Sequence, residues 1–315
     1  MLFLLCAILS SSAVALILKY AESRAYRRLP VVAANYLAAA ILSVLLAGGA
    51  LIPDGVQVDL VAAFLAEAGG VLSGSGRFSA GGSTGWAMLW GVPAGLLYFL
   101  GLISIQRSIR ESGVGLTGAF SKSAILIPIL VSVLLWRERP TSLQWTGIAL
   151  TFAAIALSQS GKRGEGSARV GAGLILMFLA VGCAELSNKV FQQYALPQYK
   201  ELFLFAVFFT AFLIATAALF KSRQGPVNKG PEGRNVLFAQ EFFVGLAVGV
   251  PNLFSSYFLI QAFATLNASV VFPLYSAGSI ALIAIGGVAL FGERPTRREL
   301  AAIAIVLAAI VLMGG

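Results

Sequence analysis

The chain has 315 residues, of which 58% are hydrophobic and 11% are charged, and its mean hydropathy is +0.89. A soluble domain normally carries about a quarter charged residues, so the composition excludes an ordinary soluble protein and predicts an integral membrane protein. The net charge of +9 raises the question of a nucleic-acid partner. The charges, however, lie in short segments between apolar runs, as the orientation rule for membrane loops requires. We therefore expect membrane lipid as a partner and no nucleic acid.

Ten apolar runs are each long enough to cross a ~30 Å hydrocarbon core as a helix. Because lipid cannot satisfy exposed backbone groups, each run should be helical, which predicts an all-α integral membrane protein. The first run has no basic residue before it, so we expect it to stay in the mature protein rather than act as a secretory signal. In chain order the runs are 2–18, 31–47, 85–105, 114–136, 142–158, 170–191, 202–220, 241–262, 268–291 and 297–312.

The long segment between the second and third runs has two parts. Residues 56–68 show helix-like apolar spacing, which favours a helix on the membrane surface. Residues 69–85 are rich in glycine and serine, which is typical of a flexible connector.

The sequence repeats itself at an offset of 155 residues. "WRERPTSLQWTGIALTFAAIAL" from Trp136 aligns without a gap with "FGERPTRRELAAIAIVLAAIVL" from Phe291. We infer two five-helix halves, 1–160 and 168–315, joined by a linker over 161–167. Because five is odd, the second half must cross the membrane in the opposite sense. Such inverted repeats are typical of secondary transporters with a substrate site near the midplane between the halves.

The Glu-Arg-Pro-Thr junction within this repeat has a structural explanation. Thr141–Gln144 and Thr296–Glu299 have the spacing of capping boxes, which start a helix, and the preceding proline ends the helix before it. We favour this interpretation over a functional role for Glu138 or Glu293.

This junction, followed by a small-residue helix and repeated after five runs, resembles the EamA-type permeases of the drug/metabolite transporter (DMT) superfamily. The resemblance covers nearly the whole chain. The junction motif is fairly specific for the family and nearly silent about substrate. The resemblance implies a ten-helix fold, a central cavity between the halves, and movement of a small metabolite, often an amino acid.

Lysine and arginine are distributed unequally between the loops. Sixteen of the 22 lie in loops that follow odd-numbered runs, against four in the loops that follow even-numbered runs. The positive-inside rule then predicts a multi-pass protein of the cell (inner or plasma) membrane, with odd-numbered loops in the cytoplasm and both termini outside. The family resemblance implies both termini inside, so the two expectations differ, and we follow the count.

Two charged side chains lie deep within runs, Lys122 in the fourth and Glu185 in the sixth. An ionisable side chain at the bilayer centre costs about 2.5–3.5 kcal/mol, and it persists when it faces a cavity or a partner. At ~1.5 Å per residue, Lys122 lies about 12 Å and Glu185 about 22 Å from the odd-loop side, a gap that the two side chains could close. Glu185 could instead pair with Lys189, one helical turn further on.

These charges have a functional and a structural interpretation. In the first, Glu185 carries a proton or binds a substrate amine, and Lys122 holds a carboxylate or other anion. In the second, the two form a static internal pair. Lys19 and Lys189 lie at run ends, where snorkelling to the headgroups is the default and a pair of symmetric gate residues is the alternative.

Other polar side chains within the runs could bind a ligand, although hydrogen bonding between helices is the simpler role for most of them. These candidates are Asn188, Gln106, Asn252, Gln261, Tyr98 and Tyr275. Four prolines, Pro93, Pro128, Pro251 and Pro273, should bend or interrupt the third, fourth, eighth and ninth runs. The GxxxG motifs at 91–95 and 245–249 predict close helix packing.

The leading hypothesis is a secondary transporter that moves a small polar metabolite, amino-acid-like or anionic, by alternating access, with a proton as a candidate coupling ion. An exporter of cationic compounds coupled through Glu185 is an alternative. A non-transporting membrane scaffold or lipid-binding protein is an alternative from another class. With no histidine, and both cysteines (Cys6 and Cys183) inside apolar runs, we expect no metal, no cofactor and no enzymatic activity.

Overall fold

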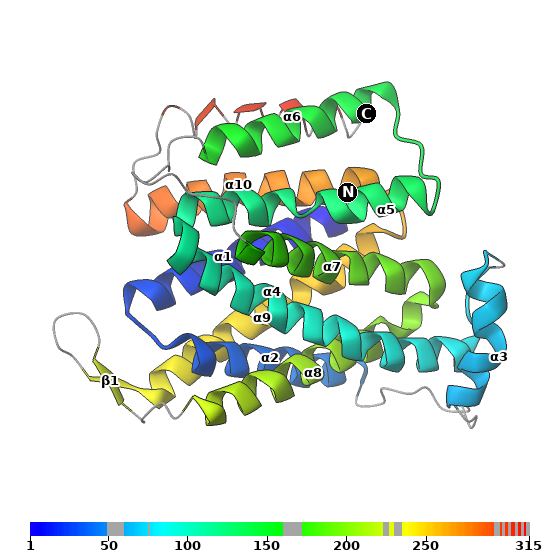
Figure 1. The fold of residues 1–315 in the computed structure, drawn as a ribbon, viewed down its shortest axis with the longest axis horizontal. Coiled ribbons are helices and arrows are strands. Elements are labelled where there is room, and N and C mark those ends of the chain that lie inside the picture. Colours follow the sequence, from blue (N-terminus) through cyan, green and yellow to red (C-terminus); the bar gives the residue numbers. More distant parts are fainter. Residues whose placement is uncertain are drawn as a thin grey trace. The chain divides into compact units, whose positions relative to one another are not determined.

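A computed structural model of the chain describes residues 1–48, 60–74, 76–159, 172–222, 227–229 and 235–292, and eight positions between 297 and 312. The described chain is helical apart from a short antiparallel ribbon of two strands (Figure 1). The elements are α1 (Leu2–Ser23), α2 (Arg28–Leu46), α3 (Leu60–Leu72), α4 (Ala80–Ser123), α5 (Leu126–Leu134), α6 (Ser142–Gln159), α7 (Ala172–Tyr194), a 3-10 turn (Pro197–Tyr199), α8 (Lys200–Lys221), β1 (Val227–Lys229), β2 (Asn235–Leu237), α9 (Phe238–Ala262) and α10 (Ala268–Phe291).

Seven helices in the described part of the chain are long and apolar enough to cross a membrane, namely α1, α2, the first part of α4, α7, α8, α9 and α10. They support a multi-pass helical membrane protein, as the composition predicts. Helix α6 coincides with the fifth predicted run. Of the tenth, 297–312, the structure describes eight positions, all of them helical.

Helix α4 differs from the two separate runs predicted at 85–105 and 114–136. It is continuous through 106–113, so the predicted loop there is wrong. That segment is charged, but it contains good helix formers such as glutamine, arginine and glutamate and no proline, so its backbone can stay helical. The helix breaks only after Ser123, because the ring of Pro128 would clash with the helical carbonyl four residues before it.

The helices form two compact units, which we describe separately. Unit 1 contains residues 1–12, 100–186 and 262–315. In it α10 packs beside α5 and α6 (Figure 1). The carboxylate of Glu138, after α5, accepts hydrogen bonds from the backbone N–H groups of Ala268 (3.1 Å) and Ser269 (2.9 Å). Glu138 therefore caps the N-terminus of α10, where a negative charge is favourable.

The capping box predicted at Thr141–Gln144 is confirmed. The side-chain oxygen of Gln144 accepts a hydrogen bond from the Thr141 backbone N–H at 2.9 Å, and the Thr141 hydroxyl accepts one from the Gln144 N–H at 3.3 Å. The box starts α6. The second predicted box, Thr296–Glu299, lies outside the described residues.

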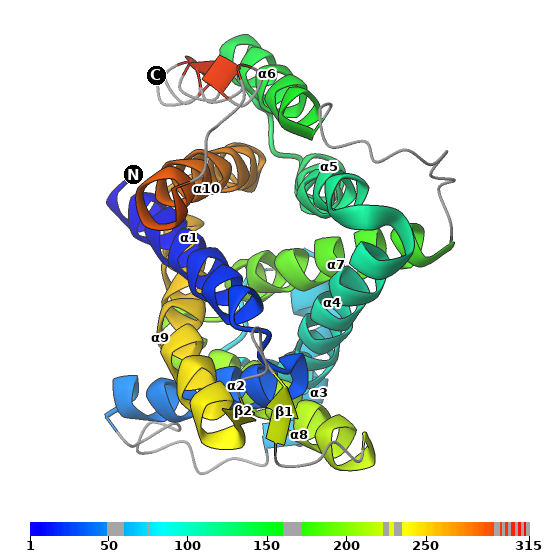
Figure 2. The same ribbon diagram turned by 90° about the vertical axis from the view of Figure 1, so that its left-hand side faces the viewer.

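Unit 2 contains residues 13–99 and 187–261. In it α2 and α8 lie side by side (Figures 1 and 2), and the β1–β2 ribbon directly precedes α9. A methyl group added at Gly91 or Gly95 of α4 would collide with Ala206 or Val207 of α8. The predicted close packing at this GxxxG motif is therefore confirmed.

The second GxxxG motif makes the corresponding contact with α2. A methyl group added at Gly245 or Gly249 of α9 would collide with Val31 or Asn35 of α2. Thus α4, from the first half of the sequence, packs closely on α8 from the second, and α9 from the second half packs closely on α2 from the first.

The turn between α1 and α2 is joined to the start of α9 by an ion pair. The Arg27 guanidinium donates from Nη2 to Glu241 Oε2 at 2.6 Å and from Nε to both carboxylate oxygens. The Arg27 backbone N–H adds a bond of 2.7 Å to Oε1. Both side chains are buried, with 11% and 0% of their surface exposed. This pair therefore fixes the start of α2 against α9.

The turn between α7 and α8 is joined to the start of α4 by neutral hydrogen bonds. The Ser83 hydroxyl accepts a bond from the Leu196 N–H at 3.0 Å, and the Tyr194 carbonyl accepts one from the Phe78 N–H at 2.9 Å. Aromatic rings pack beside these bonds, since Trp86 contacts both Phe78 and Tyr194.

Candidate functional site

Helix α7 carries a stripe of polar side chains. Glu185, Asn188, Lys189 and Gln192 follow helical spacing and share one face. Asn188 and Lys189 are 1% and 5% exposed, Gln192 is also buried and Glu185 is half-buried. The Lys189 ammonium donates to Gln192 Oε1 at 3.4 Å. Buried polar and charged side chains within a membrane span are costly, and they mark functional sites by default.

Asn188 is the start of a hydrogen-bonded network that joins three helices of unit 2. Its Nδ2 group donates to the Tyr98 hydroxyl of α4 at 2.8 Å, and that hydroxyl bonds to the Ser256 hydroxyl of α9 at 3.0 Å. We call Asn188, Tyr98 and Ser256 the three-helix network. The amide oxygen of Asn188, Oδ1, is buried and has no hydrogen-bond partner among the described residues.

A pair of amides extends this arrangement to α2. Asn252, one turn before Ser256 on α9, donates from Nδ2 to Asn35 Oδ1 at 3.0 Å. The pair can form because Gly249, with no side chain, lets α9 approach the α2 backbone at Asn35. The Tyr36 hydroxyl, also on α2, donates to the Tyr98 backbone carbonyl at 3.2 Å. Polar contacts therefore join α2, α4, α7 and α9.

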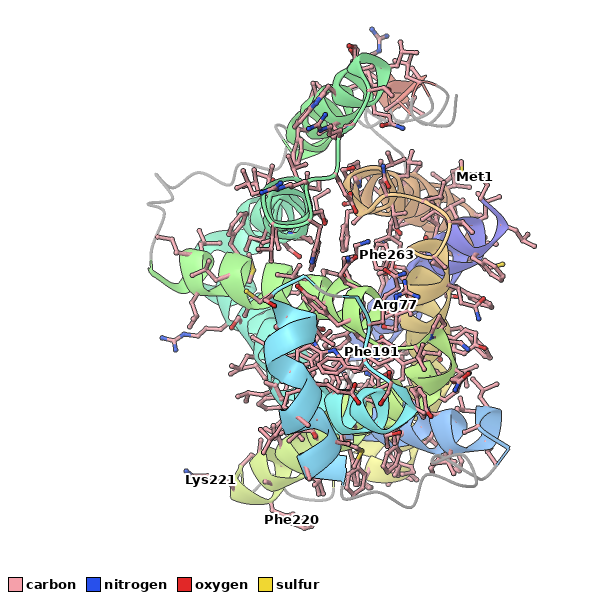
Figure 3. The ribbon with its side chains drawn as sticks, turned by 90° about the vertical axis from the view of Figure 1, so that its right-hand side faces the viewer. Met1, Arg77, Phe191, Phe220, Lys221 and Phe263 are labelled. Atoms are coloured by element: carbon pink, nitrogen blue, oxygen red, sulfur yellow. The ribbon has the colours of Figure 1, made fainter. Side chains whose placement is uncertain are left out.

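Aromatic side chains hold the network in place. The Phe208 ring of α8 stacks on Tyr36 and meets Tyr98 edge-on, with centroids 6.2 Å and 5.8 Å apart. The Trp90 indole N–H of α4 donates to the Ser187 carbonyl at 3.2 Å, directly before Asn188. Figure 3 shows Phe191, one turn beyond Asn188, in the interior, whereas Phe220 and Lys221 point away from the protein. Packing on both sides of Asn188 thus fixes the orientation of its amide.

The structure brings some of the predicted site residues together. Asn188 contacts Tyr98 directly, and Asn252 lies one turn from their partner Ser256 on α9. Lys19, Gln261 and Tyr275 are half-buried on α1, α9 and α10 respectively. The side chains of Lys122 and Gln106 lie outside the described residues, so the Lys122–Glu185 pair stays a prediction.

The four prolines occupy two kinds of position. Pro93, Pro251 and Pro273 lie inside α4, α9 and α10, and each helix continues through its proline. Pro128 lies in the first turn of α5, just after the break in the chain's helical path. Pro251 directly precedes Asn252. Because proline has no backbone N–H, α9 lacks one backbone hydrogen bond next to the Asn252 side chain. The bending expected of these helices stays a prediction.

Sequence reasoning missed Asn35, Tyr36, Ser256 and Trp90. The signal that points to Asn252, an amide in an apolar run, also points to Asn35, the only amide in run 31–47. Ser256 has no comparable signal, because serine hydroxyls in membrane helices commonly bond to their own backbone. Among the described residues, His, Cys, Asp and Glu side chains form no group of three that could hold a metal ion. Cys6 and Cys183 are half-buried free thiols.

No protein-family model matches the chain, and no curated protein matches it. A solved crystal structure of another protein is similar to this chain, with a TM-score of 0.66 at 15% sequence identity. The match covers 99% of this chain and 95% of that chain. At this identity the likeness extends to the fold and no further, so the chain is similar in fold to a protein of known crystal structure.

Proposed function

We propose that this chain is a secondary transporter of the EamA type, built from two inverted five-helix repeats, that moves a small polar metabolite by alternating access. The observation that carries the proposal is the three-helix network, in which no described residue bonds to Asn188 Oδ1. An unpartnered buried polar atom costs about 1–3 kcal/mol, which is more than a hydrogen bond between membrane helices usually contributes. A substrate that enters between these helices would supply the missing hydrogen bond.

The two GxxxG contacts support the repeat. In the first proposed half, α2 is the second helix and the first part of α4 is the third. In the second half, α8 is the second helix and α9 is the third. The third helix of each half packs closely on the second helix of the other. A two-fold relation between inverted halves produces such reciprocal contacts.

The polar stripe of α7 supports the substrate class. Lys189 is a buried cation next to Asn188, and Glu185 lies one turn earlier on the same face. A substrate with an anionic group and a hydrogen-bond donor, amino-acid-like or anionic, would suit this stripe. Lys189 disfavours a cationic substrate, so the exporter of cationic compounds is the second candidate. In either case Glu185 is the group that would carry a coupling proton.

A binding screen tests the proposal. The purified protein and its Asn188→Leu variant would be heated with amino acids, organic acids, sugars, nucleosides and cationic dyes, and any compound that stabilises the protein would be tested for uptake into proteoliposomes. Gln193→Leu, half-buried on another face of α7, is the matched control. We expect stabilisation and uptake to be lost in Asn188→Leu and kept in the control. Stabilisation without uptake would instead favour a non-transporting binding protein.

A separate experiment tests the coupling role of Glu185. We expect Glu185→Gln to abolish the pH dependence of uptake while the protein remains folded, because the amide cannot carry a proton. Uptake that keeps its pH dependence in this variant would contradict the role.

We also propose a cell-membrane location with the odd-numbered loops in the cytoplasm. Cysteines would replace Lys221, at the end of α8, and Arg77, before α4, in a Cys6→Ser/Cys183→Ser background. Both positions are exposed. An impermeant thiol reagent should label position 77 and spare position 221 in intact cells, and the reverse pattern would invert the orientation.

A further inference from the structure

Helix α3 is held firmly on the start of α4. The Phe64 ring lies against those of Phe78 and Trp86, with centroids 5.4 Å and 5.8 Å apart. The Glu67 carboxylate accepts a hydrogen bond from the Ser79 backbone N–H at 2.8 Å and another from the Ser79 hydroxyl. Most of the predicted flexible connector, 69–85, is therefore part of a helix or of this contact, and α3 has a defined inner face.

The opposite, outer face of α3 is apolar as well. Leu65 and Leu72 are 66% and 47% exposed, and Ala62, Ala66 and Gly69 between or beside them are exposed too. Glu67 is the only charged residue from Ala62 to Leu72, and its carboxylate bonds to Ser79. A helix that faces water on one side normally carries polar residues there. The outer face of α3 has none, so water is not its natural surrounding.

Helix α3 lies close in sequence and in space to a membrane span. Residues 73–79 alone separate it from the first span of α4, whose Met88, Leu89 and Val92 are exposed apolar side chains. Figure 1 shows α3 across the beginning of α4. Trp86, which contacts Phe64 of α3, and Tyr194, which contacts Trp86, are of the kinds that concentrate at the membrane–water interface.

We infer that α3 is an interfacial helix that binds the lipid bilayer, with the face of Leu65 and Leu72, here called the outer stripe, at the level where headgroups meet acyl chains. The outer stripe carries no basic residue, whereas helices that seek anionic lipid carry lysine or arginine on their polar face. Burial of apolar surface therefore drives the contact, and uncharged phospholipid is sufficient for it.

Site-directed fluorescence tests this contact in the whole protein. Leu65→Cys and Leu72→Cys, in the Cys6→Ser/Cys183→Ser background, would be labelled with a small fluorophore and reconstituted in phosphatidylcholine vesicles. Arg77→Cys, exposed in the segment after α3, is the control. Phosphatidylcholine brominated on its acyl chains should quench positions 65 and 72 several-fold more than position 77. Aqueous iodide should show the reverse order, and added phosphatidylglycerol should change neither.

Two outcomes would overturn the inference. Equal iodide quenching at positions 65, 72 and 77 would place the outer stripe in water. Weak quenching by both agents, with oxidative cross-linking of Leu65→Cys between molecules, would mean that a second copy of the chain covers it. Near-ultraviolet circular dichroism of each variant identifies misfolded samples, and labels at Leu65 and Leu72 must agree, which guards against disturbance by one substitution.

Discussion

The helices of unit 2 are joined at their two ends by different kinds of hydrogen bond. At one end the start of α2 is joined to α9 by the buried Arg27–Glu241 pair, which makes several charged hydrogen bonds. At the other end the turn before α8 is joined to α4 by neutral bonds, among them that of Leu196 with Ser83. The GxxxG contacts of the same helices, α9 with α2 and α4 with α8, are alike.

The comparison separates what holds the helices together from what holds their ends. Close packing at glycine depends on shape and is the same in both pairs. Hydrogen bonds to charged groups contribute about 1.5–3 kcal/mol each, against about 0.5–1.5 kcal/mol for neutral ones. The neutral end should therefore open more readily than the charged end in any conformational change that separates these helix ends.

The largest effect should come from breaking the charged end. Glu241→Gln leaves Arg27 buried without its counter-charge, and we expect a loss of about 3 kcal/mol in stability, measured as a lower unfolding temperature in detergent. Replacing both residues, Arg27→Met with Glu241→Leu, should recover most of the loss, because no buried charge remains.

Glu22→Gln is the control for this prediction, because its 3.4 Å pair with Arg28 is exposed. Its effect should stay within about 0.5 kcal/mol. If Glu241→Gln proved as mild as this control, the ion pair would not be what holds the charged end.

The glycine contacts should respond equally in both helix pairs. Gly95→Ala and Gly249→Ala each place a methyl group against the backbone of a neighbouring helix, and we expect each to cost about 1–3 kcal/mol. Gly69→Ala in α3, where no described residue lies within 4 Å of the added methyl group, should instead gain up to about 1 kcal/mol. A large difference between the stability losses of Gly95→Ala and Gly249→Ala would show that the hydrogen bonds at the helix ends also affect the packing at these glycines.

A smaller effect is expected at the neutral end. Ser83→Ala removes the acceptor of the Leu196 N–H, and we expect a loss of about 1–2 kcal/mol because the donor is left without a partner. Ser43→Ala is the matched control, since this buried hydroxyl donates to Ala39 of its own helix. Thermal unfolding of the two variants side by side gives the comparison, and equal losses would argue against the Ser83 contact.

The smallest difference concerns local opening. Arg27 and Leu196 each donate a backbone N–H across an end of unit 2, the first to a carboxylate and the second to a hydroxyl. A difference of about 1 kcal/mol corresponds to roughly fivefold slower hydrogen exchange at Arg27 than at Leu196. Mass spectrometry of exchanged peptides measures this ratio, and faster exchange at Arg27 would reverse our order of the two ends.

Local patterns in the sequence predicted much of this fold. Apolar runs gave the positions of the long helices, and the spacing of Thr141 with Gln144 gave the start of α6, because both depend on neighbours in sequence. The predicted loop at 106–113 is wrong for a related reason. Charge suggested an exit from the membrane, but charge by itself does not end a helix.

Contacts between distant residues could not be predicted in this way. Glu241 lies at the start of a run and Arg27 just before another, and nothing local pairs them. Glu138 was expected to be structural, yet its bonds to the start of α10 join positions 130 residues apart. Asn188 and Tyr98 stood out separately as polar residues in apolar runs, whereas the hydrogen bonds that join them to Ser256 depend on how three helices pack.

The stacked indoles of Trp86 and Trp90 have a practical consequence. Their ring centroids are 5.4 Å apart and their planes differ by 5°, so the two chromophores should couple and give a strong near-ultraviolet dichroic band. Both belong to unit 2, whereas Trp136 and Trp145 belong to unit 1. Trp90 bonds to Ser187 beside the candidate site, and Trp86 lies against Phe64 of the lipid-facing helix. The protein thus contains its own optical reporter, which would register motion at either place without an added label.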